Sequence, residues 1–239
     1  MKGDAPLKKL FSAIRHGDTE TICALLDKKP ELIACTATVP PKKDAGQSPL
    51  QVAIKGAHPE IAHLLLDRGA DVNFMEAADC GNDWRMPVVQ DAVMAAVRCT
   101  RWNTIMNGHI TQFNSAEKAE KAFLLLKRMI EMGADLTAKD SYGNSALNRA
   151  LLDTMQILPS FHHGEQRYMK DRLLTPELQA DLNRVYALIM TASPEVTQHV
   201  IAPDSKETLA MQFLLNNGGL RYEEHRYDDV NRRWVSIQI

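Results

Sequence analysis

The sequence predicts an all-α solenoid of about four to five helix pairs, with long insertions and a C-terminal β-hairpin. The first observation is a phrase that occurs twice at the end of helical stretches, as Gly69-Ala70-Asp71-Val72-Asn73 and as Gly133-Ala134-Asp135-Leu136-Thr137. The second is that apolar residues in helical spacing recur between Gly- and Pro-containing turns. A unit repeated in this way cannot bury its own apolar face, so neighbouring copies are expected to stack.

The first repeat is expected over residues 7–40. Its first helix would end in the stretch Ala13 to Asp18. Lys8 and Lys9 would give this copy the polar outer face that a terminal repeat needs where it meets solvent. It is therefore predicted to be an N-terminal capping repeat.

The second repeat, residues 44–75, has the clearest local signals. Ser48 can cap a helix, and Pro49 then occupies the first helical position, where a missing N–H has no cost. Leu50, Ala53 and Ile54 form one apolar stripe of that helix. A second helix contains Leu64-Leu65-Leu66, and Gly69 suits the left-handed conformation that ends a helix.

Residues 46–73 resemble the repeat of the ankyrin family. Gly46 to Ile54 follows G-x-T-P-L-H-x-A-A, Ala57 to Leu66 follows G-H-x-E-I-V-x-L-L-L, and Asp67 to Asn73 follows x-x-G-A-D-V-N. Weaker similarity extends over roughly residues 7–217, so the chain is identified as an irregular, bacterial member of this family. The resemblance implies a non-catalytic module that binds proteins and needs no cofactor. It also implies that His58, at the G-H position, forms a hydrogen bond between neighbouring repeats.

The third and fourth repeats are expected at 86–138 and 140–197. The start of the third is open, because Pro87 and Ala92 compete for the beginning of its first helix. Second helices are expected at 118–132 and 176–191. Both copies belong to a predicted repeat domain over residues 1–219.

A fifth, degenerate repeat at 204–219 and a C-terminal extension at 220–239 complete the predicted organisation. Val235, Ile237 and Ile239 alternate with polar or aromatic residues, which predicts strands at 222–227 and 234–239. An isolated hairpin is marginal in water, so this one is expected to dock on the last helices as a cap. The alternative is a strand that binds a partner.

Insertions interrupt the repeats between Asn73 and Asp91, at 101–115 and at 159–175. Such insertions map to loops on one face of a solenoid. The last one contains His162-His163 beside Glu165, the only local clump of metal-ligand residue types. Adjacent histidines are poorly placed for one metal, so a solvated loop is expected and no metal site.

Composition limits the function classes. The net charge of −2 provides no electrostatic footprint for nucleic acid or an anionic membrane. No apolar run reaches the roughly 20 residues of a membrane span. Without an apolar leader the chain is expected to be cytoplasmic, whereas a leader removed beforehand would make it periplasmic or secreted.

The cysteines are scattered and form no CxxC motif. They are expected to be reduced, and a Cys80–Cys99 disulfide is the alternative. Asp71 and Asp135 are expected to accept local hydrogen bonds in their turns rather than to act as an acid/base pair. No nucleophile elbow, phosphate loop or zinc-protease motif is present, so no enzyme is predicted.

The family binds partners through its finger tips and the exposed face of its first helices, and we carry this over to matching positions. The expected contacts are Arg15, His16, Asp44, Gln47, Lys55, Phe74, Trp84, Arg85, Arg98, Trp102, Ser141, Tyr142, Asn144 and Asp153. Trp, Tyr and Arg dominate interface energies, which favours Trp84, Arg85, Trp102 and Tyr142. The alternative is that both tryptophans fold back over the insertions.

The most specific function predicted is that of an inhibitor or immunity protein, monomeric in isolation, which binds a folded toxin or effector enzyme. Irregular repeats with individual insertions suit one dedicated partner. The alternatives are a scaffold or regulatory subunit of a larger complex and a secreted host-directed effector. A cryptic metal-dependent enzyme built on His162, His163 and Glu165 is the least favoured.

Overall fold

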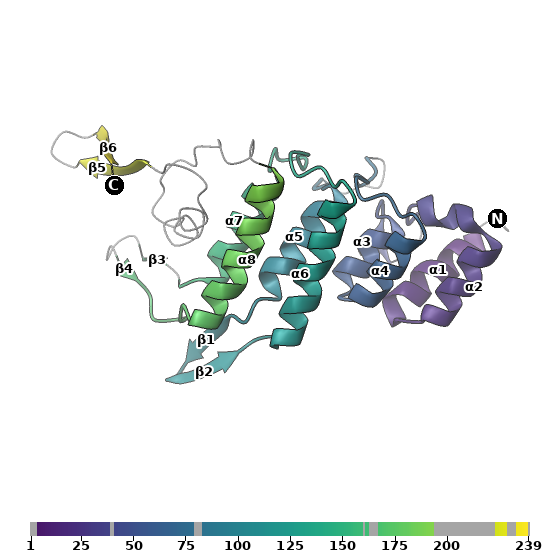
Figure 1. The fold of residues 1–239 in the computed structure, drawn as a ribbon, viewed down its shortest axis with the longest axis horizontal. Helices are drawn as coiled ribbons and strands as arrows, with labels where there is room; N and C mark the ends of the chain where they lie inside the picture. The colour runs from purple at the N-terminus through teal and green to yellow at the C-terminus, as the bar shows by residue number, and fades with distance from the viewer. Residues whose placement is uncertain are drawn as a thin grey trace. The chain divides into compact units, whose positions relative to one another are not determined.

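The computed structural model describes residues 4–38, 41–78, 83–159, 161–162, 167–193, 223–228 and 233–238. Within them the chain forms eight α-helices, two short 3-10 helices and three antiparallel strand pairs (Figure 1). It divides into two compact units, residues 1–95 with 121–145, and residues 96–120 with 146–239. The fold is thus mostly helical, as predicted.

The first unit is built from paired helices. Its elements are α1 (Asp4–His16), α2 (Thr19–Lys28), η1 (Pro30–Ala34), η2 (Lys42–Asp44), α3 (Pro49–Lys55), α4 (Pro59–Asp67), most of α5 (Val88–Arg98) and most of α6 (Ala116–Glu131). Helix α1 packs on α2 and α3, and α3 packs on α4. The core of these helices contains the fully buried side chains of Leu10, Ile14, Ile22, Leu50 and Leu65.

The local signals of the second repeat are confirmed. Ser48 accepts a hydrogen bond from the backbone of Gln51 and the Gln51 side chain reciprocates, which is a complete capping box before α3. Gly69 has φ +84°, the left-handed conformation that lets α4 end in a turn. The predicted bond between repeats is also present, because Nε2 of His58 lies 3.2 Å from the backbone oxygen of Arg15.

The turns after α4 and α6 behave as expected. Oδ1 of Asp71 accepts a hydrogen bond from the backbone of Asn73, and Oδ1 of Asp135 accepts one from the backbone of Thr137. The Thr137 hydrogen bonds lower the pKa of Asp135 against a smaller opposing effect of burial. Both aspartates therefore stabilise the backbone of their turns.

The start of α5 settles the open register of the third repeat. The helix begins at Val88, directly after Pro87, so the start at Ala92 was wrong. The reason is pairing outside the helix: Met75 and Pro87 form a β-bridge, and the Val88 amide donates to the backbone oxygen of Phe74 over 2.8 Å. These contacts keep the backbone extended up to Pro87, so the helix begins at the next residue, Val88.

The second unit contains the fourth helix pair. Helix α7 (Ala146–Ile157) packs on α8 (Pro176–Ala192), and the Tyr186 hydroxyl donates to Thr154 in the buried contact between them. Short strands β3 (Phe161–His162) and β4 (Arg167–Tyr168) pair in the loop that joins these helices. Their side chains, and those of His163 and Glu165, lie outside the part of the structure that is described.

A hairpin in the middle of the chain replaces a predicted loop. Strands β1 (Asn103–Met106) and β2 (His109–Gln112) pair with Met106 opposite His109. The turn is Asn107-Gly108, with φ +51° and +78°, the two positive φ angles that a type I′ turn requires. The Asn-Gly pair was the missed signal, because residues 101–115 were interpreted only as an insertion.

The prediction of a hairpin only at the C-terminal end therefore needs correction. The hairpin with described side chains is β1–β2, and the amide of Ile105 on its first strand donates to the backbone oxygen of Asp171 over 2.7 Å. Strands β5 (Glu223–Asp228) and β6 (Arg233–Gln238) also pair antiparallel. Their expected docking as a cap concerns side chains that are not described, and the fifth repeat expected at 204–219 lies outside the described residues.

Candidate protein-binding surface

Two loops of the first unit form one surface, which we call the finger pair: residues 83–87 before α5 and residues 140–144 before α7. The amide of Ser141 donates to the backbone oxygen of Arg85 over 2.9 Å, and the amide of Arg85 donates to the Ser141 hydroxyl over 3.1 Å. The same hydroxyl donates to the backbone oxygen of Asp83 over 3.0 Å. These bonds join segments that are 56 to 58 residues apart in sequence.

Asp140 organises the finger pair from beneath. Its carboxylate accepts hydrogen bonds from the indole of Trp84 at 3.1 Å and from the amides of Tyr142 and Asn144 at 2.9 and 2.8 Å. Burial, the largest single influence, raises the pKa of Asp140, but the hydrogen bonds from Asn144, Trp84 and Tyr142 together outweigh it and lower the pKa. The carboxylate is therefore ionised at neutral pH and holds both loops.

Helix α5 anchors the second loop of the finger pair. The buried side-chain amide of Gln90 donates to the backbone oxygens of Ala138 and Asn144 over 3.1 and 2.7 Å. The first of these oxygens lies just before the loop in sequence and the second at its end. The loop is consequently fixed to a packed helix, although its tip faces solvent.

Five of the predicted contact residues meet in the finger pair, namely Trp84, Arg85, Ser141, Tyr142 and Asn144. Trp84 is 38% exposed and Tyr142 is 69% exposed. A hydrogen bond holds the indole of Trp84, and Tyr142 lies on a loop fixed through its backbone. Aromatic residues on such preorganised loops lose less conformational entropy when they bind, which makes them effective interface anchors. The finger pair thus has the residue types and the rigidity of a protein contact.

The last-turn cations of α1 and α3 are held by carboxylates from the adjoining loop or helix. Arg15 Nη1 lies 2.6 Å from Asp44, and Lys55 Nζ lies 2.8 Å from Glu76 and 3.6 Å from Asp91. All three carboxylates are buried. The predicted contact Asp44 is therefore beneath the surface, where it positions Arg15.

Other predicted contacts on this side differ in exposure. The side chain of Gln47 is buried and donates to the backbone oxygen of Lys43 over 3.1 Å, so it too supports the surface from within. His16 is exposed, with Nδ1 2.7 Å from the backbone oxygen of Ser12. Phe74 is half-buried beside the bridge that precedes α5.

The acid Asp91 lies fully buried beside Glu76 and Gln51. Gln51 donates to its Oδ2 over 2.8 Å, whereas Oδ1 has no hydrogen-bond partner among the described residues. Burial is the main cause that raises the pKa of Asp91 to about 7; Glu76 adds to the effect, while Lys55 and Gln51 oppose it. Asp91 therefore keeps its proton to a much higher pH than an exposed aspartate does.

In the second unit, Arg98 and Asp153 form another internal ion pair. Asp153 is fully buried between Arg98, whose Nε lies at 2.7 Å, and Arg149, whose Nε lies at 2.8 Å. Two guanidinium groups thus satisfy one carboxylate. Asp153 is not on the surface, and Arg98 is the member of this cluster that solvent reaches.

Trp102 follows the alternative in which a tryptophan covers an insertion. Its ring stacks on Phe113 with centroids 4.2 Å apart, and its indole donates to the backbone oxygen of Arg98 over 3.1 Å. Phe113 itself stays 38% exposed, and Met106 and Ile110 on the β1–β2 hairpin are exposed further, at 72% and 59%. Sequence reasoning missed them because it did not recognise the hairpin.

Cysteine and metal chemistry is not evident in the described residues. Cys23, Cys35 and Cys99 are free thiols, whereas Cys80, the other half of the disulfide that the sequence left open, lies outside the described residues. Burial raises the pKa of Cys35 to about 11 and also raises that of Cys99, which keeps both thiols protonated. Among the described residues no group of His, Cys, Asp and Glu is arranged to hold a metal ion.

Comparison with known proteins agrees with the repeat in the first unit. Residues 45–82 match the family model of the ankyrin repeat, and this range contains α3, α4 and the loop after them. A search of curated proteins finds no match. None of the described helices has the length and apolar character needed to cross a membrane. Ankyrin repeats are typically non-catalytic modules and suggest a protein partner. The chain therefore contains an ankyrin repeat, at residues 45–82.

Proposed function

We propose that this chain is a non-catalytic protein-binding module and that the finger pair is its principal contact surface. The observation that carries the proposal is the joint anchoring of Trp84 and Tyr142 on Asp140. Both rings remain exposed although their loops are fixed. Exposed aromatic rings contribute little to the stability of the fold, but their preorganisation lowers the conformational entropy lost on association.

More specifically, we propose an inhibitor or immunity-type binder of one effector or toxin protein. The support is the rigidity of the finger pair, because a surface fixed by internal hydrogen bonds from both loops suits one complementary partner better than many dissimilar ones. Promiscuous binders instead use flexible surfaces that can repack.

The binding proposal is tested with the full chain as bait in its native host, followed by affinity measurement with the protein it captures. Trp84→Ala and Tyr142→Ala should each weaken that complex by about 2 kcal/mol, because truncated aromatic anchors commonly cost this much. Leu124→Ala is the matched control. Leu124 on α6 is 43% exposed, a fraction similar to the 38% of Trp84, and it lies outside the finger pair. Equal affinities for the three variants would exclude the finger pair as the contact.

The inhibitor proposal has a separate readout. If the captured protein is an enzyme, one equivalent of the chain should abolish its activity, and Trp84→Ala should restore it in proportion to the lost affinity. A captured enzyme that remains fully active in the saturated complex would contradict the inhibitor role and leave a scaffold or regulatory subunit. The binding proposal would survive that result.

A further inference from the structure

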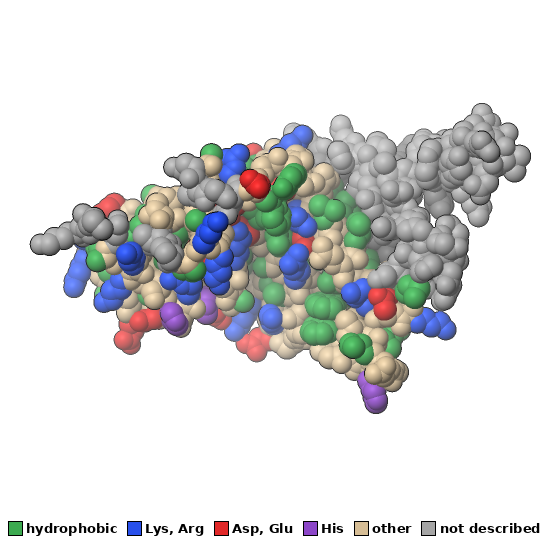
Figure 2. Space-filling model, turned by 180° about the vertical axis from the view of Figure 1, so that it is seen from behind, with side chains coloured by type: hydrophobic (Ala, Val, Ile, Leu, Met, Phe, Trp, Pro, Cys, Tyr) green, Lys and Arg blue, Asp and Glu red, His purple; other side chains and the backbone are tan. Residues whose placement is uncertain are grey.

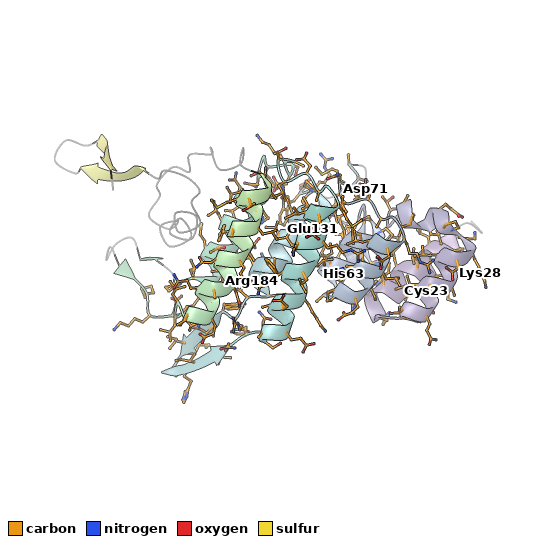
Figure 3. The ribbon with its side chains drawn as sticks, viewed as in Figure 1. Cys23, Lys28, His63, Asp71, Glu131 and Arg184 are labelled. Carbon is orange, nitrogen blue, oxygen red and sulfur yellow. The ribbon has the colours of Figure 1, made fainter. Side chains whose placement is uncertain are left out.

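Charges are distributed unequally over the first unit. On the side of α2, α4 and α6, each ion pair includes an exposed carboxylate: Arg68 with Asp27, Lys121 with Glu60, and Arg128 with Asp67. The three carboxylates are 60% to 68% exposed. Figure 3 shows this side, with His63 of α4 and Glu131 of α6 labelled on it. Positive and negative charge therefore alternate there.

The side of α1 and α3 differs, because its carboxylates lie beneath its cations. Asp44, Glu76 and Asp91 are 1% to 8% exposed, whereas their partners Arg15 and Lys55 are 23% and 35% exposed. A partner protein would meet the cations and not the acids. Burial of the negative partner thus leaves an outward-facing positive surface.

Three further lysines extend this surface. Lys42 and Lys43 on η2 are exposed and form no ion pair in the described part of the chain. Lys8 is exposed on α1 and precedes Arg15 by two helical turns, which places both on the same stripe of the helix. We call Lys8, Arg15, Lys42, Lys43 and Lys55 the basic row. Figure 2 shows Lys and Arg side chains gathered over the N-terminal unit from the side opposite to Figure 1, with Asp and Glu mostly at its margin.

The basic row is continuous with the finger pair. Lys55 bonds Glu76, and the other carboxylate oxygen of Glu76 accepts a hydrogen bond from the amide of Met86 over 3.2 Å. Met86 follows Arg85 of the finger pair directly. A partner seated on Trp84 and Arg85 would therefore reach Lys55 with its adjoining surface.

We propose that the basic row receives an acidic segment of the protein partner, a proposal that rests on the proposed binding function. Carboxylates on that segment would pair with Lys42 and Lys43 and approach the outward faces of Arg15 and Lys55. Complementary charge of this kind speeds association and selects partners.

The chemistry favours carboxylates of a protein over a phosphate polymer. Arg15 and Lys55 already lie over buried acids, so their charge is partly compensated, and the whole chain has a net charge of −2. Nucleic-acid binding depends on many uncompensated cations that release counterions from the phosphate backbone. A few carboxylates on a folded or helical segment match this modest and localised charge better.

The test uses the full chain and a fluorescent synthetic peptide of alternating Glu and Ala, with fluorescence anisotropy at low salt as the readout. Lys42→Glu with Lys43→Glu should weaken peptide binding about tenfold, because two attractive pairs become repulsive. Neither side chain forms an ion pair with the described residues, so these changes should leave the thermal midpoint unaltered. Arg15 and Lys55 are unsuitable for the test, since their removal would strand buried carboxylates.

The matched control is Lys28→Glu with Lys29→Glu, which makes the same change in charge at exposed lysines at the end of α2; Lys28 is labelled in Figure 3. This control should bind the peptide as the unaltered chain does. The same peptide with Gln in place of Glu should not bind. Added salt should weaken the complex, because the charges lie at the surface.

Three results would overturn the proposal: no binding of the Glu peptide, equal weakening by both double substitutions, or tighter binding of a DNA duplex or of phosphatidylserine vesicles than of the peptide. None of these results bears on Trp84→Ala, so the finger pair would stand as a contact. Conversely, a captured partner that binds the Trp84→Ala variant with unchanged affinity would contradict the finger pair as the contact. The peptide result would still apply to the basic row.

Discussion

At the scale of single residues, the buried acids Glu76 and Asp91 share one ammonium group, that of Lys55. Burial disfavours the charged form of Asp91, and the neighbouring Glu76 carboxylate adds to that effect. This electrostatic cost appears at Asp91, whose pKa rises to about 7. Glu76 keeps the shorter contact with Lys55, 2.8 Å against 3.6 Å.

A pH-dependent stability follows from Asp91. The folded chain holds this proton up to about pH 7, whereas the unfolded chain releases it near its ordinary value of 3.8. Between these values the folded state binds more protons, so the contribution of Asp91 to stability falls as the pH rises through this window. Asp91→Asn should remove that loss, so the variant should gain stability relative to the unaltered chain as the pH rises toward 7.

Urea unfolding of both proteins across this pH range measures the difference directly. Asp135→Asn is the control, because the lowered pKa of Asp135 places its own pH dependence below the ordinary value of 3.8, so the stability difference for this variant should change little as the pH rises toward 7. A difference between Asp91→Asn and the unaltered chain that does not change with pH would show that Asp91 ionises normally in the folded state.

At the scale of elements, the β1–β2 hairpin is joined to α8 through Arg101. Its Nε and Nη2 lie 2.9 and 2.8 Å from the buried carboxylate of Asp181, and its backbone amide donates to the same group over 3.0 Å. A bidentate guanidinium with an added amide fixes the direction of the chain as it enters β1. Asn103 adds two hydrogen bonds to the backbone of Leu173.

Arg101→Ala should destabilise the second unit by about 1–3 kcal/mol, because it leaves a buried carboxylate with one donor. Urea unfolding monitored by circular dichroism provides the measurement. Arg184→Ala is the control, on the helix α8 that also carries Asp181. The ion pair of Arg184 with Glu120 has both side chains exposed and should contribute about 0–1 kcal/mol to stability. Similar losses for both variants would mean that Asp181 is rehydrated when Arg101 is removed.

At the scale of the whole molecule, burial varies strongly between the described elements. The side chains from Pro49 to Ile54 in α3 are all buried, whereas every residue of β2 is exposed. Repeat proteins derive stability from each unit and its interfaces, so different segments open with different free energies. The ankyrin repeat at 45–82 should therefore belong to the most stable part of the chain.

Native-state hydrogen exchange tests this ranking. Amides in α3 and α4 should exchange most slowly, with protection approaching the global free energy of unfolding, and amides of β2 should exchange by local opening. Residues 118–129 of α6 provide an internal reference, since that helix has both buried and exposed faces. Protection of β2 equal to that of α3 would contradict the expected difference in stability.

The sequence by itself determined the features that depend on neighbours along the chain. Ser48, Pro49 and Gly69 predicted the limits of their helices correctly, because caps and left-handed turns are satisfied within a few residues. The Asn107-Gly108 turn is equally local, because an Asn-Gly pair is by itself a signal for a type I′ hairpin turn.

Only the tertiary structure decided which side chains reach the surface. Asp44, Gln47 and Asp153 were predicted to be contacts, yet Asp44 and Asp153 are buried against cations and Gln47 against a loop backbone. Trp84 and Trp102 could each have been anchors or covers, and the deciding contacts, with Asp140 and Phe113, come from other segments. Burial and charge pairing between distant segments are set by packing, so periodicity along the chain cannot reveal them.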